Sequence, residues 1–453
     1  MHLIKNIIRV AFANIMNFGS SFIVGFILPA YLSVPEYGLY KEYTLYLSFV
    51  YLFSFGFNDG IYIKYGGKNP DSIDKTVIHE EHSFLSVFQL IVFILMLSFS
   101  ILIKDPILIL FSIATLFMAI TTYHQNFAQA TGNFKLYSYA NILKTIVNVL
   151  TILFAIFILN SRNYMDYVIM NIVTNLFVFI LYEYVFIKEY GFRFKFSKSN
   201  KVSIFKIGIF VLIANMSMTF VGNIGSWIVN FGFPVENFAQ YSFSTSMLNL
   251  ILLIVNAVGL IFYNVISKNE NEEMLKFTKR ILLLLGICGG LLFFVFKVII
   301  QVFLTKYTPA LSLLSITFIS IPYIMVANVI ITNLYKSRKN EKKYFRDVIG
   351  FAGASFIFVG IVYLVTNSMT SIALATTFSY VFWYIYSTNV EYKYLKSSLK
   401  EYILLISHFI VFYSTANLFS NYIGASVYLI YVVVVLFAFR NDLFKIVEYA
   451  KNK

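Results

Sequence analysis

Three polar residues recur on one face of an apolar stretch in the N-terminal half. The stretch 138–159 is rich in Ile, Leu, Val and Phe, and it contains Asn141, Lys144 and Asn148 at spacings of three and four residues. In a helix this spacing places the three side chains on one face. Because a charge inside a membrane span is costly, Lys144 is a candidate for binding an anionic group such as a diphosphate. The alternative is a lysine whose ammonium group extends back to the membrane interface.

Other basic residues lie at the ends of apolar stretches. Arg9 and Lys206 occupy matching positions at the start of the first and seventh stretches. They could receive an anionic head group, or they could serve as positively charged anchors at the cytoplasmic surface. Lys41 and Glu42 begin the second stretch at its outer end, where they could line or gate an opening or form an exposed ion pair.

Amide side chains recur at related places in the first and seventh stretches. The first contains Asn14 and Asn17, and the seventh contains Asn215, Asn223 and Asn230. An amide both donates and accepts hydrogen bonds, so it can bind sugar hydroxyls. Amides also join neighbouring helices inside membranes. We expect some of these residues to line a polar cavity and the others to hold helices together.

No residue pattern predicts catalysis, a metal or a resident cofactor. His79-Glu-Glu-His82 falls in an expected loop with no third ligand nearby, whereas a metal site needs three or four converging ligands. His124 and His408 are single histidines in apolar stretches, which favours a hydrogen-bonded structural role over a proton relay. No phosphate-binding loop occurs, so ATP does not drive this chain directly. The sequence therefore predicts a protein that is not an enzyme, with coupling to an H⁺ or Na⁺ gradient or to the membrane potential left open.

The composition indicates a membrane protein. Hydrophobic residues make up 59% of the 453 residues and charged residues only 12%, which is far from the composition of a soluble domain. The net charge of +14 lies in short segments between apolar stretches, where contact with anionic membrane lipids explains it better than nucleic-acid binding.

The apolar stretches predict an all-α polytopic membrane protein with about fourteen transmembrane helices. Each stretch has the length of about 17–25 residues that a bilayer requires. The predicted spans are 10–31, 40–57, 84–103, 107–127, 138–159, 165–187, 205–231, 238–265, 281–303, 310–334, 348–366, 370–390, 401–418 and 422–438. Most of the 35 lysines and arginines fall in segments that would lie on the same side of the membrane as the N-terminus. This asymmetry predicts a multi-pass protein of the plasma or inner membrane with both termini in the cytoplasm.

Short similarities between the two halves predict an internal duplication. Glu36–Tyr40 resembles Asn237–Tyr241, and the segment after the fourth stretch, 132–137, resembles that after the tenth, 339–344. Transporters built from two repeats place their substrate site at the repeat interface. The predicted divisions are an N-terminal six-helix lobe (1–187), a basic cytoplasmic linker (188–204), a C-terminal six-helix lobe (205–392), and two extra helices with a cytoplasmic tail (393–453).

Three short motifs resemble a known family. They are Tyr31–Tyr40, then Gly56-Phe-Asn-Asp-Gly60 with Tyr65-Gly-Gly67, and Gln129–Lys135. With the span pattern, they resemble the polysaccharide-transport (Wzx-type flippase) branch of the multidrug/oligosaccharidyl-lipid/polysaccharide (MOP) exporter superfamily. The resemblance implies two lobes around a central cavity that opens alternately to the two sides of the membrane. It implies a cargo of undecaprenyl-diphosphate-linked oligosaccharide, flipped outward for assembly of capsule, O-antigen, exopolysaccharide or teichoic-type polymers, with a polymerase and a chain-length regulator as possible partners.

Two other transport functions remain open, and an enzymatic function is not favoured. A drug/cation antiporter of the same superfamily would carry an acidic residue within a lobe, and the first and seventh stretches contain no Asp or Glu. A lipid II flippase would concentrate arginines in its first two spans, where this chain has only Arg9 at the edge. A membrane-bound acyl- or glycosyltransferase would need a histidine or a pair of acids presented at one interface, and the sequence shows no such group.

Overall fold

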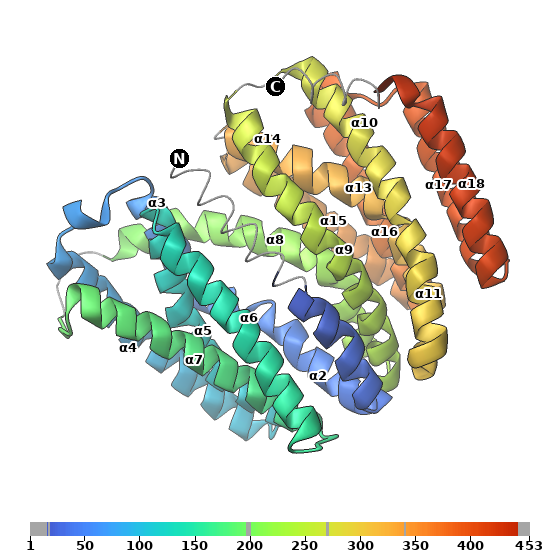
Figure 1. The fold of residues 1–453 in the computed structure, drawn as a ribbon. Coiled ribbons are helices and arrows are strands. Elements are labelled where there is room, and N and C mark those ends of the chain that lie inside the picture. Colours follow the sequence, from blue (N-terminus) through green and yellow to red (C-terminus); the bar gives the residue numbers. More distant parts are fainter. Residues whose placement is uncertain (1–15, 17–18, 196–200, 269–270, 339–340, 443–453) are drawn as a thin grey trace. The chain divides into compact units, whose positions relative to one another are not determined.

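The protein is helical throughout the described residues, which are 16, 19–195, 201–268, 271–338 and 341–442 of the computed structural model (Figure 1). These residues form α-helices joined by short turns and single turns of 3₁₀- or π-helix, and no β-strand occurs among them. The predicted all-α fold class is therefore confirmed.

Short polar turns between apolar stretches determine where the helices begin. Asp74 caps the backbone of α4 (Lys75–Leu102), and Asp105 caps α5 (Pro106–Ala130), which starts with proline. Asn133 and Asn163 cap the next two helices in the same way. Because these side chains satisfy amide groups that a helix leaves without partners, they fix each helix start.

The chain divides into two compact units. Unit 1 comprises residues 1–223 and 345–349, and unit 2 comprises residues 224–344 and 350–453. The predicted lobes and linker were drawn from the internal repeat rather than from contacts, and they stay a prediction.

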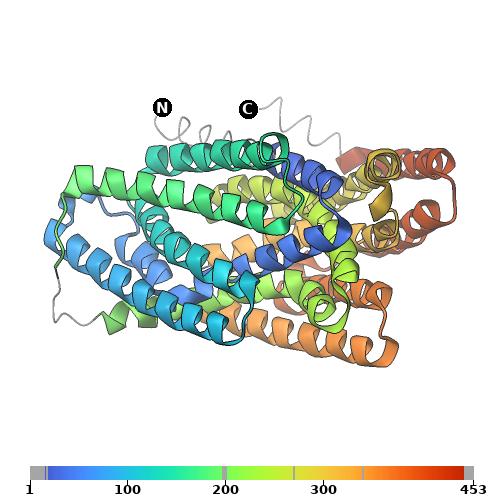
Figure 2. The same ribbon diagram turned by 90° about the horizontal axis from the view of Figure 1, so that it is seen from below.

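Unit 1 is built around α5, which packs against α2, α3, α4 and α7. Helices α6 and α7 also lie side by side, as the two views show (Figures 1 and 2). The helices of unit 1 are Gly19–Tyr31, α2 (Val34–Leu47), α3 (Phe57–Tyr65), α4, α5, α6 (Phe134–Phe157), α7 (Tyr164–Tyr190) and the first part of α8 (Val202–Gly232).

Unit 2 contains a sharply bent helix pair and a C-terminal hairpin. The pair 310–318 and 321–335 bends by 47° near Pro322, where proline interrupts the backbone hydrogen bonding. The hairpin of α17 and α18, red in Figure 1, packs against α10, α11 and α12. The helices are α9 (Val235–Lys268), α10 (Glu272–Gly289), α11 (Leu291–Phe303), α12 (Ala310–Phe318), α13 (Ile321–Val326), α14 (Thr332–Ser337), α15 (Glu341–Thr366), α16 (Met369–Tyr386), α17 (Leu399–Asn417) and α18 (Asn421–Ala438).

Eight helical segments of the described chain are long and apolar enough to cross a membrane, or nine when the bent pair counts as one span. They are α4, α5, α6, α7, α8, α10 with α11, α15 and α18. The protein is therefore a multi-pass membrane protein, and the count of fourteen spans is not confirmed. One predicted span, 40–57, is broken because Phe55 and Gly56 have positive φ angles of 50° and 87° between α2 and α3.

The segment 58–83, expected to be a cytoplasmic loop between the second and third predicted spans, is largely helical. Most of α3 and the first two turns of α4 lie within it. The loop prediction was wrong because its charged residues, which suggested solvent, are paired within the protein. Glu81 is fully buried and binds Lys64 and the hydroxyl group of Tyr65.

Glycines allow α3 and α8 to cross at backbone contact. A Cβ atom on Gly208 would collide with the carbonyl oxygen of Gly56, and one on Gly60 would collide with that of Ile204. Gly56 and Gly60 belong to one of the motifs that carry the family resemblance, so this motif has a packing role in the structure.

Candidate functional site

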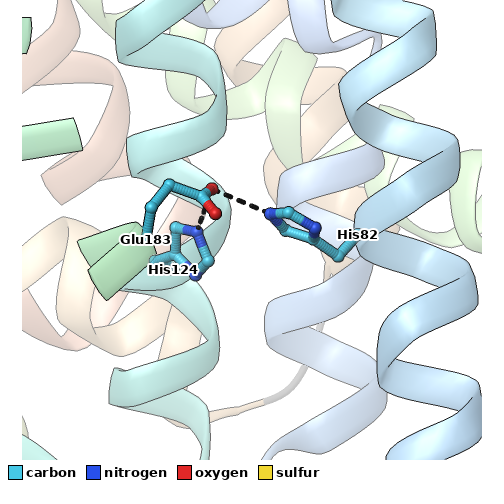
Figure 3. A group of neighbouring side chains, drawn as sticks. All are labelled: His82, His124 and Glu183. Carbon is cyan, nitrogen blue, oxygen red and sulfur yellow. Dashed lines mark hydrogen bonds and ion pairs between the residues drawn. The ribbon is translucent and has the colours of Figure 1, made fainter. Parts of the chain in front are cut away.

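Two histidines and a glutamate from three helices of unit 1 converge on one point (Figure 3). His82 lies on α4, His124 on α5 and Glu183 on α7. The Nε2 atoms of His82 and His124 are 2.8 Å and 3.0 Å from the same carboxylate oxygen, Oε1 of Glu183. One ligand atom from each residue lies within 4.8 Å of the others. The three residues are called the His–Glu cluster below.

Aromatic rings hold the two imidazole rings in place. His82 stacks on Phe186 with the ring centres 4.5 Å apart, and His124 lies parallel to Tyr182 at 5.8 Å. The side chain of His124 is only 5% exposed, whereas those of His82 and Glu183 are 18% and 19% exposed. The cluster is therefore closed to solvent on the α5 side and partly open at His82 and Glu183.

The expectation that His79-Glu-Glu-His82 has no third ligand nearby is wrong. The segment lies on α4, and His82 meets residues 42 and 101 positions later in the chain. His124 is a hydrogen-bonded group, as predicted. A usable signal was present, because each of the three residues lies about two turns from the same end of an antiparallel helix series.

The other residues of the 79–82 segment attach α4 to its neighbours. His79 Nε2 lies 3.1 Å from the carbonyl oxygen of Tyr190, at the end of α7. Glu80 forms an ion pair of 3.6 Å with Lys201, in the predicted basic linker. The start of α4 is thus fixed on several sides.

The three polar residues predicted to share one face, called the α6 stripe below, lie on the interior side of α6. Asn141, Lys144 and Asn148 are half-buried, and no described residue forms an ion pair with Lys144. With 3.6 residues per turn, the stripe lies opposite a row of exposed apolar side chains. That row consists of Tyr139, Ile146, Leu150, Phe154 and Phe157. The stripe therefore faces away from the surface that suits lipid.

The amides of α8 form a second polar row. Asn215, Thr219 and Asn223 follow at intervals of four residues, and Asn215 is exposed. The hydroxyl group of Thr219 donates to the backbone carbonyl of Asn215 at 3.1 Å, and the amide of Asn223 donates to that of Thr219 at 2.9 Å. The spacing gives α8 one continuous polar edge.

The remaining predicted residues are scattered. Lys41 is half-buried on α2, and its neighbour Glu42 accepts a hydrogen bond of 2.8 Å from Tyr46. Lys206 is exposed in the second turn of α8. Arg9, Asn14 and Asn17 lie outside the described residues. The described contacts do not join Lys41 or Lys206 to the polar rows on α6 and α8.

Unit 2 contains a buried ion pair that the sequence did not indicate. Lys279 of α10 donates to Glu401 of α17 at 3.0 Å, and the two side chains are 1% and 5% exposed. Lys279 also donates to the carbonyl oxygen of Leu395 at 2.7 Å, and Glu401 accepts from the backbone of Ser398. This pair joins the C-terminal hairpin to the rest of unit 2.

His408 and Tyr428 form another buried contact within unit 2. His408 is fully buried on α17, with Nδ1 3.2 Å from the hydroxyl group of Tyr428 on α18. That hydroxyl group also donates to the carbonyl oxygen of Ile287 at 2.7 Å. The predicted structural role of His408 agrees with this arrangement.

The fold is that of known membrane transporters. The structure of the lipid II flippase MurJ in an inward closed conformation matches with a TM-score of 0.66 and 15% identity, over 96% of this chain and 99% of that one. An outward-facing multidrug resistance MATE family transporter of the MOP superfamily matches with a TM-score of 0.56 and 13% identity, over 92% and 97%. A MOP superfamily transporter from Pyrococcus furiosus matches with a TM-score of 0.54 and 12% identity, over 87% and 97%.

The sequence itself identifies the family. The family model described as polysaccharide biosynthesis protein matches residues 3–232, just over half of the chain, and the chain belongs to this family. No curated protein sequence matches the chain. The predicted resemblance to a polysaccharide family is confirmed, and the fold is shared with transporters of the MOP superfamily.

Proposed function

We propose that this protein is a flippase that moves undecaprenyl-diphosphate-linked oligosaccharide repeat units from the cytoplasmic to the outer leaflet. Membership of the polysaccharide biosynthesis family carries the proposal, and the fold shared with the lipid II flippase MurJ supports it. The protein then acts as a transporter rather than as an enzyme. Its product would supply assembly of capsule, O-antigen, exopolysaccharide or a teichoic-type polymer, with a polymerase and a chain-length regulator as partners.

The substrate sets the requirements for the transport path. A sugar diphosphate cannot cross hydrocarbon alone, because its charges and hydroxyl groups would lose their hydrogen bonds to water. The interior stripe on α6 offers one cation, Lys144, between two amides that can bind polar groups. We assign Lys144 to the diphosphate, and we assign Asn141, Asn148 and the polar edge of α8 to sugar hydroxyls.

The energy source of transport and the orientation of the chain in the membrane are part of the same proposal. The sequence contains no phosphate-binding loop, so the drive would come from an H⁺ or Na⁺ gradient, the membrane potential or removal of product outside. The distribution of lysine and arginine supports a plasma or inner membrane location with both termini in the cytoplasm.

Flipping by Lys144 variants tests the site. The protein is reconstituted into liposomes that carry a fluorescent undecaprenyl-diphosphate sugar in both leaflets, and accessibility from outside is followed over time. We expect Lys144→Ala to slow flipping by at least about tenfold, the effect of losing roughly 1.4 kcal/mol of charge-assisted binding, and Lys144→Arg to keep more activity. Lys135→Ala, which removes an exposed lysine from the first turn of the same helix, is the matched control.

The outcomes separate the site from the function. Equal loss in the Lys144→Ala and Lys135→Ala variants would show a general effect of charge on α6. Full activity of Lys144→Ala would reduce Lys144 to an interfacial anchor and leave the flippase proposal standing. No flipping by the wild-type protein would contradict the proposed function itself.

The MATE-like structures support a second candidate, a drug/cation antiporter. It would move a cationic dye against H⁺ or Na⁺ without moving the lipid-linked sugar. The lone cation of the α6 stripe argues against it, because a lysine repels a cationic drug.

A further inference from the structure

We propose that the His–Glu cluster of unit 1 binds a divalent transition-metal ion of the Zn²⁺ type. His82, His124 and Glu183 provide two imidazole nitrogens and one carboxylate oxygen, the donor set that zinc and similar ions bind. Such a site is a property of the folded protein and does not depend on the proposed transport function.

The distances approach those of an ion site and can reach them through side-chain rotation. The two Nε2 atoms already point at one carboxylate oxygen, at 2.8 Å and 3.0 Å. An ion at about 2.0–2.2 Å from each ligand atom needs those atoms roughly 3.3 Å apart in tetrahedral geometry. Each nitrogen–oxygen distance must lengthen by a few tenths of an ångström. The three ligand atoms, which lie within 4.8 Å of one another, must also close to that separation through side-chain rotation.

The surroundings hold the ligands as a metal site requires. Phe186 and Tyr182 stack on the two imidazole rings and limit their rotation. Neighbouring groups that orient the ligands strengthen metal binding. Glu80 ties the first turns of α4 to Lys201, so His82 is carried by a helix end that is held in place.

The site is open enough for an ion to enter and to keep a water molecule. His82 and Glu183 are 18% and 19% exposed. On the other side, His124 lines a small pocket together with Asn133, Glu189 and Tyr190. Three protein ligands with an open fourth position is the arrangement that keeps a bound water.

A bound ion would clamp α4, α5 and α7 at one end. The three ligands come from three helices, so the ion would cross-link them and add to the packing and hydrogen bonds that already join them. A ligand that binds only the folded protein also raises its stability in proportion to the logarithm of its concentration.

Co²⁺ provides a direct probe, because its visible absorption reports on the coordinating atoms. The full-length protein is purified in detergent, stripped with a chelator and titrated with Co²⁺ and then with Zn²⁺. We expect one equivalent of Co²⁺ to bind the wild-type protein and to be displaced by Zn²⁺. We expect His82→Ala and Glu183→Gln to weaken binding by at least about tenfold.

His79→Ala is the matched control, because it removes a neighbouring imidazole from the same helix and leaves the His–Glu cluster intact. It should bind Co²⁺ like the wild-type protein. A cooperative melting transition without metal establishes that each variant is folded. If His82→Ala does not fold, Glu183→Gln alone tests the loss of metal binding. Absence of Co²⁺ binding by the wild-type protein, or equal binding by the cluster variants, would overturn the proposal and leave a hydrogen-bonded structural group.

Discussion

The two units each bury charged residues among apolar helices, but the protein satisfies these charges to different degrees. Lys279 and Glu401 of unit 2 are almost fully buried, and the lysine has a second acceptor in the backbone while the glutamate accepts from Ser398. In the His–Glu cluster of unit 1, a single carboxylate oxygen serves both imidazoles, and two of the three side chains are partly exposed.

This difference separates a structural role from a ligand-binding role. A buried pair with its hydrogen bonds filled has no room for another group, and removing one partner leaves an uncompensated charge. A partly exposed cluster in which two imidazoles share one carboxylate oxygen can bind an ion in place of those hydrogen bonds. Buried charge alone therefore does not mark a functional site, whereas buried polar groups that share their hydrogen-bond partners next to an opening do.

The largest expected effect is loss of stability on breaking the unit 2 pair. Lys279→Ala leaves Glu401 buried without its cation, and we expect it to cost about 3–5 kcal/mol, seen as a large fall in melting temperature in detergent. The double variant Lys279→Met with Glu401→Leu leaves no charge behind and should melt closer to wild type than the single variant. A Lys279→Ala protein that melts like wild type would contradict the comparison.

A smaller effect is expected in the His–Glu cluster. Glu183→Gln keeps the side-chain size and one acceptor oxygen, and water can reach the 19% exposed group. We expect a loss of about 1 kcal/mol in metal-free protein, typical of one weakened hydrogen bond. The same melting assay without metal measures it. A loss as large as that of Lys279→Ala would mean that the cluster is a structural pair of the same kind.

The smallest effect is expected at an exposed pair on α10. Glu272 and Lys276 lie 3.6 Å apart one helical turn from each other, with side chains 62% and 46% exposed. Glu272→Gln should change stability by less than about 0.5 kcal/mol, because water screens the pair. High salt should leave the melting temperature of this variant and of the wild type equal. A change above 1 kcal/mol would show that exposure does not rank these pairs.

The helical fold and the α6 stripe could be predicted because both depend on local spacing. Apolar stretches show individual helices, and the positions of Asn141, Lys144 and Asn148 define a face within one helix. The stripe was predicted on one face, and the structure places that face away from the exposed apolar row.

The long-range clusters could not be predicted in the same way. His82 and Glu183 are 101 residues apart, and Lys279 and Glu401 are 122 apart, so their pairing depends on which helices become neighbours. A single sequence shows that the three cluster residues lie near the same end of their helices, but it does not show which helices become neighbours. The charged start of α4 also suggested a loop, because its residues are polar and their partners lie on other elements.

Transport of two substrates by the wild-type protein tests the central claim most directly. Liposomes containing the protein are loaded in parallel with a fluorescent undecaprenyl-diphosphate sugar or with a cationic dye, under an H⁺ or a Na⁺ gradient, and empty liposomes serve as the control. The flippase account predicts that the lipid-linked sugar becomes accessible from outside while the dye stays in place. Exchange of the dye for H⁺ or Na⁺ without movement of the sugar would contradict it and establish the antiporter.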